Sequence, residues 1–394
     1  MRRPLFDFER GGTVEQEPKQ KGGPGVLGAA AGLAAVLGLM LALLLTGGGG
    51  RAAAASAQAV LEVPRQQAAG AAEQEVGNTV IPIGRAVGIK LFSDGVLVVG
   101  LSPVETEDGL HSPGKECGLK TGDVITHING TEVDTIEQVQ AVVAERAGET
   151  LTIQAMRGQR QLQLTTAAVE NSQGVYQLGI WLRDSMAGIG TITFYDPDSG
   201  VFAALGHGIN DVDTSMLMPL ESGSIMPAAV SDVQKGMAGQ PGELHGQFDL
   251  TCDLGTLYAN TNRGIFGRLA EPGLADGLEA VEVAPRDEVH VGDAVIRANV
   301  CGDEVEEFDV RITHVDTQGD GTRSLMVQIT DPELLEATGG IVQGMSGSPI
   351  LQDGKLVGAV THVLVNDPTR GYGIFAETML KAAGGGTVQP SGGA

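Results

Sequence analysis

The sequence is poor in cysteine and in metal-binding patterns. Its 394 residues include 3 cysteines, Cys117, Cys252 and Cys301, which is too few for a disulfide framework. No feature of the spacing supports a Cys252–Cys301 bridge. Neither a CxxC nor an HExxH pattern occurs, so the sequence predicts no metal site and no cofactor.

Basic residues and aromatics are also scarce. Lys and Arg number 25 against 49 Asp and Glu, which gives a formal net charge of -24. Phosphate binding needs a basic face, so nucleic acid is excluded as a partner. Aromatic residues make up 4% of the chain, whereas glycine occurs 59 times. This composition favours short strands joined by tight turns.

One long apolar run stands near the N-terminus. Residues 26–45 contain no charge and match the length that a helix needs to cross a bilayer. Five basic residues precede the run, which predicts a cytoplasmic leader (1–25) and export of everything after it. Two outcomes stay open: the helix remains as an anchor, or signal peptidase cuts near the A-x-A pattern at 55–57. Residues 46–80 are predicted to be a linker.

Residues 81–169 form the first predicted folded unit. The stretch GLKTGDVITHINGTEV, followed by a helix over 136–147 and two alternating strands, resembles a PDZ domain of the bacterial protease type. Such a domain binds an extended peptide at an open strand edge. The resemblance implies that this edge, and the peptide-binding residues, are Val87, Gly88, Ile89, Lys90 and Leu91. The alternative is a PDZ fold that binds nothing.

Residues 171–383 form the second predicted unit, followed by a loose tail (384–394). Many short strands separated by Gly, Pro and Asp predict an all-β sandwich or barrel. Short helices are expected near 332–337 and 376–382.

A serine between glycines is the strongest chemical signal. Ser346 lies in GMSGSP, where the glycines permit a sharp turn that exposes the hydroxyl. The turn also lets the amides of Gly344 and Ser346 converge on an oxyanion. We therefore predict Ser346 as the nucleophile rather than a polar turn residue. Ser348 is the rival, but Pro349 follows it and has no N–H to extend the oxyanion site.

A histidine in a similar setting is the predicted general base. His207 follows the apolar strand 201–205 and stands between Gly206 and Gly208. The alternatives are a turn histidine, or a metal site with Asp211 and Asp213. His362, soon after the serine, is a second candidate base or a wall residue of the cleft.

A carboxylate should orient the base. The sequence offers Asp331, Asp211, Asp213, Asp249 and Asp253. Asp331 ends an apolar strand upstream of Ser346, but an Asp before Pro332 also predicts a helix N-cap.

Two longer stretches, GIGTITFYDPDSGVFAALGHGINDVDT and GGIVQGMSGSPILQDGKLVGAVTHVLVNDPTRGYGIF, resemble the stage IV sporulation protein B (SpoIVB) family of serine peptidases. The resemblance implies a mainly β protein: a membrane helix, a PDZ domain, and a chymotrypsin-like peptidase domain of the double-barrel type. It assigns His207 as base, Ser346 as nucleophile and Asp331 as acidic partner.

The same resemblance implies an exported enzyme of the forespore intermembrane space. It would cut a membrane-associated regulator, and itself, in signalling that activates processing of a mother-cell sigma factor precursor. Its partners would be protein substrates at a membrane surface and, through the PDZ domain, other copies. A non-catalytic PDZ scaffold and a general envelope protease are the alternatives.

Overall fold

The computed structural model describes residues 78–270 and 272–384. The predicted leader, the helix at 26–45, almost all of the linker and nearly all of the tail lie outside these residues. Within the two described ranges, no helix is long and apolar enough to span a bilayer.

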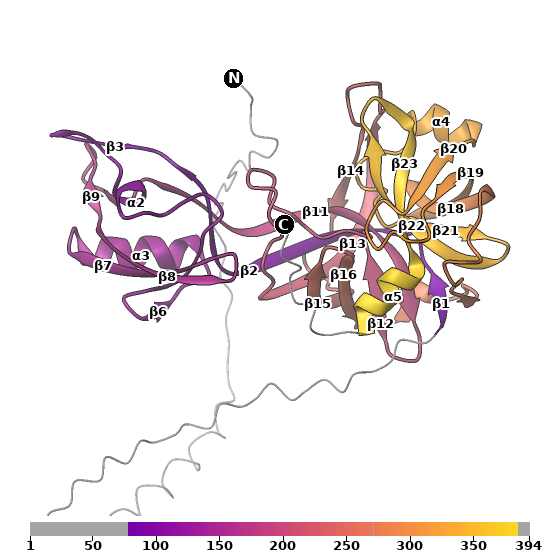
Figure 1. Ribbon diagram of the computed structural model, residues 1–394, viewed down its shortest axis with the longest axis horizontal. Helices are drawn as coiled ribbons and strands as arrows, with labels where there is room; N and C mark the ends of the chain where they lie inside the picture. Colours follow the sequence, from indigo (N-terminus) through magenta and orange to yellow (C-terminus); the bar gives the residue numbers. More distant parts are fainter. Residues whose placement is uncertain (1–77, 271, 385–394) are drawn as a thin grey trace, which may run out of the picture. The chain divides into compact units, whose positions relative to one another are not determined.

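Six consecutive strands close a barrel in the C-terminal part of the chain, which we call the second barrel (Figure 1). Around the ring, the order is β18-β19-β20-β23-β22-β21. Buried and half-buried positions alternate along β20, whereas β21 is buried throughout, and the inward residues of the barrel form one apolar core. The strands are β18 (Gly292–Cys301), β19 (Glu304–Val315), β20 (Leu325–Ile329), β21 (Pro349–Gln352), β22 (Lys355–Leu364) and β23 (Asp367–Phe375).

A second ring of antiparallel pairings forms the first barrel. It runs β2-β11-β12-β16-β15-β13 and returns to β2. The strands are β2 (Ala86–Leu101), β11 (Ile180–Asp196), β12 (Val201–Ala204), β13 (Ser222–Gln234), β15 (Gly255–Thr261) and β16 (Gly264–Leu269). Together the two barrels agree with the predicted chymotrypsin-like architecture.

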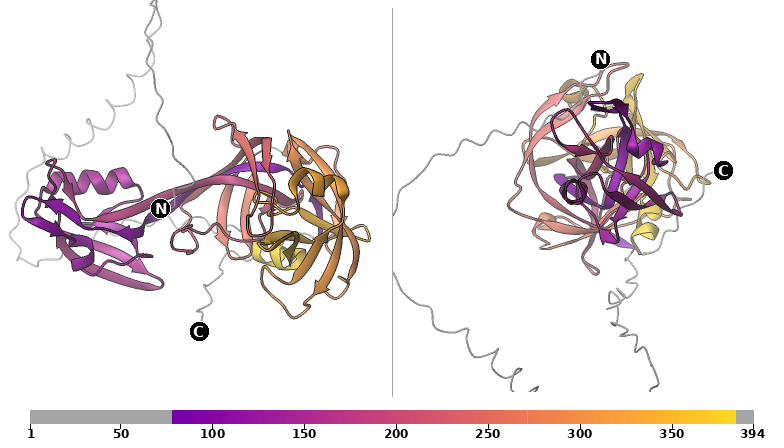
Figure 2. Two further views of the ribbon diagram at one scale, coloured as in Figure 1. Left: turned by 90° about the horizontal axis from the view of Figure 1, so that it is seen from above. Right: turned by 90° about the vertical axis from the view of Figure 1, so that its left-hand side faces the viewer.

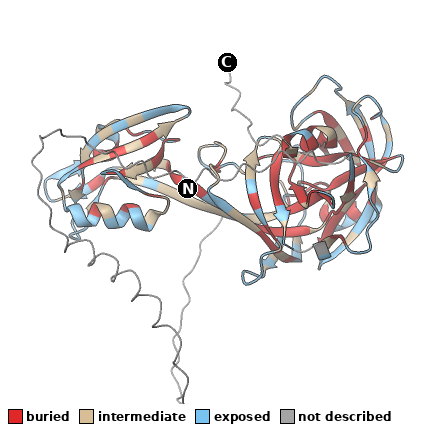
Figure 3. Ribbon diagram, turned by 90° about the horizontal axis from the view of Figure 1, so that it is seen from below, coloured by how far each residue is buried: buried red, intermediate tan, exposed pale blue. Residues whose placement is uncertain are grey.

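Shorter elements complete the barrels. β14 (Glu243–Phe248) pairs with β13, and β1 (Thr79–Pro82) joins β11 to β17 (Val281–Glu282). Helices α4 (Pro332–Thr338) and α5 (Ala376–Gly384) stand where the sequence predicted helices, and a 3-10 turn spans Pro272–Ala275. Figure 3 shows buried positions, in red, gathered within the barrel strands.

The PDZ unit is inserted between two strands of the first barrel. The chain leaves the barrel along β2, builds the PDZ unit, and returns along β11. Its other elements are β3 (Val104–Thr106), β4 (Gly109–His111), α2 (Pro113–Glu116), β5 (Val124–Ile128), β6 (Thr131–Glu132), α3 (Ile136–Arg146), β7 (Thr150–Arg157), β8 (Arg160–Ala167), β9 (Val169–Glu170) and β10 (Tyr176–Gln177).

Helix α3 of this unit starts as its sequence predicts. The Thr135 side chain accepts a hydrogen bond from the amide of Gln138, and the Gln138 side chain accepts one from the Thr135 amide, which makes a capping box. Val139 and Val143, four residues apart, bury the inner face of the helix in the core of the PDZ unit. Figure 2 shows this helix against its sheet from two further directions.

The structure overturns the predicted peptide-binding edge. Residues 87–91 are not an open edge, because they pair with β11 on one side and with β13 on the other. Both neighbours belong to the first barrel, so residues 79–91 are barrel residues rather than the start of the PDZ unit. A pattern of apolar residues identifies a strand but does not show which domain supplies its neighbours.

Candidate active site

The Ser346 loop joins the end of α4 to β21 and depends on glycine. Gly344 and Gly347 have φ angles of +99° and +100°, which side chains rarely adopt. A Cβ at Gly347 would also lie 2.1 Å from the carbonyl oxygen of Thr191. The loop therefore packs directly on β11, and the Ser346 carbonyl accepts a hydrogen bond from the Thr191 amide (3.1 Å).

Two amides of this loop have no hydrogen-bond partner among the described residues. They are the N–H groups of Gly344 and Ser346, the pair that the sequence predicts for an oxyanion site. Their neighbours in the loop are occupied: the Met345 amide donates to Val342 and the Gly347 amide to Val360. Gly344 and Ser346 both line the same pocket, so their free donors are available to a ligand there.

Burial separates the two serines. The side chain of Ser348 is fully buried and its hydroxyl has no partner among the described residues. Ser346 is half-buried, lines the pocket, and donates a hydrogen bond to the Thr361 carbonyl oxygen (2.7 Å). Only Ser346 of the two is placed to meet a substrate.

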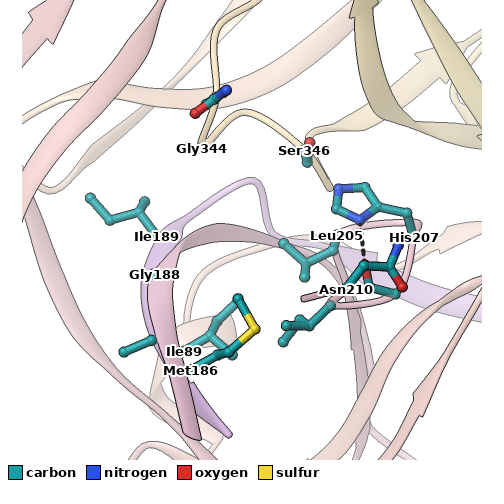
Figure 4. A pocket seen from close by; sticks show the side chains of 13 residues that line it. Ile89, Met186, Gly188, Ile189, Leu205, His207, Asn210, Gly344 and Ser346 are labelled. Atoms are coloured by element: carbon teal, nitrogen blue, oxygen red, sulfur yellow. Dashed lines mark hydrogen bonds between the residues drawn. The ribbon is translucent and has the colours of Figure 1, made fainter. Parts of the chain in front are cut away.

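His207 lies next to Ser346 in the pocket, directly after strand β12 (Figure 4). Its Nδ1 is 2.9 Å from the Gly208 carbonyl oxygen, which can only accept, so Nδ1 carries the proton. Nε2 is then the unprotonated nitrogen, as a general base requires. Burial lowers the pKa of His207 below its usual 6.5, although the Gly208 carbonyl opposes this, so the ring stays neutral at neutral pH.

The glycines around His207 allow close packing. A Cβ at Gly208 would lie 2.2 Å from Leu217 and 2.7 Å from the Thr261 carbonyl oxygen, and Gly206 has a φ of +68°. Leu205 shares this left-handed conformation (φ 67°) without being glycine. Such backbone strain is typical of functional sites.

His362 is the second histidine of the site. Its ring centroid is 5.0 Å from that of His207, and its Nδ1 is buried without a partner among the described residues. Burial, then repulsion from His207 and from Arg323, lowers the pKa of His362 to about 4. It forms a neutral wall beside the base.

The acidic partner predicted from the sequence is not where a triad needs it. Asp331 caps α4: it accepts hydrogen bonds from the amides of Glu333 and Leu334, both 2.9 Å, and from Asp309 at 3.3 Å. The atom that a triad carboxylate would contact, Nδ1 of His207, is bonded to a backbone carbonyl instead. The helix-cap alternative accounts for Asp331, and the assignment to the triad is corrected.

Three of the other candidate carboxylates, Asp211, Asp213 and Asp249, have partners away from His207. Arg183 forms ion pairs with both Asp211 and Asp213, which removes the basis for a metal site with His207. Asp249 accepts hydrogen bonds from Thr251. No group of three or more His, Cys, Asp or Glu side chains in the described ranges is arranged to hold a metal ion.

The pocket itself has a volume of about 280 Å³ and a largely apolar wall. Strand β11 supplies residues 186–189, and Ile89, Leu205 and Ile209 complete the wall beside the two catalytic candidates. Figure 4 shows Ile89, Met186, Ile189 and Leu205 around one hollow, with Ser346 and His207 together at one side of it.

Family comparisons agree with this geometry. The model of the family described as SpoIVB peptidase S55 matches residues 174–380, just over half of the chain. The chain belongs to the SpoIVB peptidase S55 family. A PDZ domain model matches residues 109–157 of this S55 peptidase, inside the inserted unit.

Similarity to individual proteins covers less of the chain or has lower sequence identity. A protein of Mesorhizobium japonicum named as a zinc metalloprotease, mll0638, is 28% identical over 118 residues, or 27% of this chain. The chain spans about a third (32%) of that relative's length.

Three solved structures show low overall similarity. A PDZ domain from Listeria monocytogenes has 24% identity and a TM-score of 0.19, and covers 23% of this chain and 87% of its own. A thermostable serine protease from an extremophilic microorganism has 12% identity and a TM-score of 0.29, and the match covers 51% of this chain and 91% of that protease. A Mycobacterium tuberculosis protease in its active form has 14% identity and a TM-score of 0.27, and the match covers 64% of this chain and 88% of that protease.

Sequence reasoning missed the wall of the pocket in this S55 peptidase. Residues 186–189 carry no chemical signature, and their role comes only from the return of β11 into the barrel. Thr361 was missed for the same reason, because its contribution is a carbonyl oxygen that any residue could supply.

Proposed function

We propose that this chain is a serine endopeptidase in which Ser346 is the nucleophile and His207 the general base. The observation that carries the proposal is one pocket that holds the half-buried Ser346, a neutral histidine with Nε2 free, and two amides without a partner among the described residues. Those are the three parts that acyl transfer needs.

The reaction follows from these atoms. The Ser346 hydroxyl turns from the Thr361 carbonyl to His207 and gives its proton to Nε2 as Oγ attacks the peptide carbonyl carbon. The amides of Gly344 and Ser346 donate to the resulting oxyanion. The imidazolium then protonates the leaving amine, and water hydrolyses the acyl-enzyme by the reverse sequence. The Gly208 carbonyl, rather than a carboxylate, orients the base and accepts from the imidazolium.

The apolar pocket wall suggests the substrate class. A substrate side chain that enters beside Ile189 and Leu205 gains most when it is apolar. We therefore propose cleavage at sites flanked by an apolar residue.

The biological setting is proposed from the family and from the apolar run at 26–45. The peptidase would be exported and held at a membrane, where it cuts a membrane-associated regulator, and its own N-terminal linker, in sporulation signalling. Flotation with lipid vesicles tests whether residues 1–46 hold the protein at a membrane. We expect the full chain to float with the vesicles and residues 47–394 not to float; flotation of both or of neither would contradict the proposal.

The catalytic proposal is tested with residues 47–394 as wild type, Ser346→Ala and Ser348→Ala. We expect Ser346→Ala to lower kcat/KM for casein by roughly 10⁴-fold or more, because it removes the nucleophile. Ser348→Ala should keep most of the activity and self-cleavage, read by intact mass. Equal activity in all three would indicate a contaminating protease, and loss only in Ser348→Ala would identify the other serine. Inactivity of all three would favour the scaffold.

A further inference from the structure

A second, larger hollow lies in the PDZ unit between helix α3 and the start of β11. Its volume is about 590 Å³, and we call it the α3 groove. The apolar residues Ile136, Val139, Val143, Leu178, Ile180 and Leu182 line it. Trp181, the chain's single tryptophan, also lines the groove, and 63% of its surface is exposed.

One end of the groove offers unpartnered backbone donors. Leu178 and Gly179 lie between β10 and β11, and their amides donate no hydrogen bond to any described residue. Gly179 has a φ of +67°, and a Cβ there would lie 2.3 Å from the Ser102 carbonyl oxygen. Consecutive free amides beside an apolar groove can hold a terminal carboxylate.

Strand β11 leads from this groove to the catalytic pocket with one edge open. Between Ile180 and Thr191, β2 is the only strand in the described part of the chain that pairs with β11. The amide and carbonyl of Thr191 point away from β2, because they bond to Ser346 and Leu205. Alternate residues of a strand face the same edge, so Ile189 and Ala187 also present their backbone groups there. Both residues line the catalytic pocket.

The direction of β11 fits a substrate held at both places. A polypeptide that adds antiparallel to β11 runs from the catalytic pocket to the α3 groove. Its C-terminus therefore arrives at the amides of Leu178 and Gly179. Ile180 and Thr191 are separated by about 35 Å of strand, or about ten residues of an extended partner, at about 3.3 Å per residue.

We propose that the open edge of β11 is a substrate track that measures the cleavage position. A polypeptide with a free, apolar C-terminus binds in the α3 groove, and Ser346 cuts it about ten residues before that end. Capture of a chain end beside a helix and a strand edge is general to PDZ domains. The proposal rests on the catalytic function proposed above, and it adds the track along β11 and the spacing.

Binding at the groove is measured without catalysis. Ser346→Ala protein is titrated with a ten-residue Gly-Ser peptide ending in Val, as the free acid and as the amide, with Trp181 fluorescence as the signal. We expect the acid to bind at least tenfold more tightly. Ala144→Asp, which puts a charge into the groove, should abolish binding. Ala141→Asp is the matched control, because it is an exposed alanine on the same helix outside the groove.

The spacing is measured by hydrolysis. A cleavage site is first mapped in casein. In a series of peptides, this site is then followed by a Gly-Ser spacer of about 2 to 20 residues, a range that brackets the track, and by a terminal Val. We expect kcat/KM to peak when the site lies about ten residues from the end, at least tenfold above the shortest spacer. Ala144→Asp should flatten this profile, whereas Ala141→Asp, which lies outside the groove, should leave it unchanged.

The outcomes separate the two proposals. A flat spacing profile, or equal binding of acid and amide, overturns the track even when Ser346-dependent hydrolysis persists. Equal loss of binding in Ala141→Asp and Ala144→Asp also contradicts it. Hydrolysis that does not require Ser346 would instead refute the catalytic proposal, whereas the fluorescence titration would still stand.

Discussion

The catalytic pocket and the α3 groove are lined by the same strand but are built differently. The catalytic pocket depends on backbone conformations that few residues adopt, at Leu205, Gly206, Gly344 and Gly347. The α3 groove depends on a regular helix, a strand edge and apolar side chains. Chemistry needs atoms placed within fractions of an ångström, whereas capture of a chain end needs an edge and a wall. Substitutions should therefore affect the two sites very unequally.

The largest contrast is expected at Gly347. In Gly347→Ala, the new Cβ would collide with the Thr191 carbonyl and displace the amides of the oxyanion site. We expect kcat/KM to fall by roughly 10²- to 10³-fold, the usual cost of losing such a donor. Peptide binding at the α3 groove, read by Trp181 fluorescence, should stay the same.

A matched control for Gly347 stands in the next turn. Gly354 also has a positive φ (+78°), but a Cβ there meets nothing within 4 Å. Gly354→Ala should keep its activity. If both variants lose activity equally, the left-handed backbone rather than the collision is responsible.

The second-largest contrast is expected in the pH dependence, because acid should lower catalysis and not peptide binding at the α3 groove. His207 must be neutral to accept the Ser346 proton, and burial lowers its pKa below 6.5. We expect kcat/KM to be level from pH 7.5 down to the usual histidine pKa of about 6.5, and to fall about tenfold per pH unit below the pKa of His207. Peptide binding to the groove should not follow this profile. A midpoint above 6.5 would mean that a charge partner, not burial, controls the base.

The smallest effect is expected outside both sites, at Asp331. Asp331→Ala removes the cap of α4 and should lower the free energy of unfolding by about 1 kcal/mol, measured by urea denaturation. Asp331→Asn keeps a good cap and should be nearly as stable as the wild type. A large fall in kcat for Asp331→Asn at unchanged stability would return Asp331 to the catalytic triad.

Local patterns predicted what depends on local chemistry. The helix at 136–147, the serine between glycines and the histidine after its strand are each visible in a few consecutive residues. The double barrel was predicted only through family resemblance, because strand neighbours come from distant parts of the chain. The same limit explains the error at residues 87–91, whose two partners lie more than ninety and more than a hundred residues further along.

Asp331 shows a different limit. The pattern Asp-Pro-Glu indicates a helix cap, whereas the family resemblance assigns a catalytic carboxylate, and the hydrogen bonds that Asp331 accepts from the amides of Glu333 and Leu334 decide for the cap. The α3 groove was missed because Leu178 and Gly179 contribute backbone amides, which no residue pattern marks.

The insertion of the PDZ unit also affects how the chain folds during synthesis. Strand β2 leaves the ribosome early, but its partner β11 is complete only after the whole inserted unit has been made. Ala86 of β2, for example, pairs with Thr191 of β11. Contacts so far apart in the sequence form slowly, and an unpaired apolar strand is prone to aggregation until they form. The PDZ unit has its own core and can fold first, which would bring the ends of β2 and β11 together. In this order of events, the inserted domain serves as the nucleus for closing the barrel.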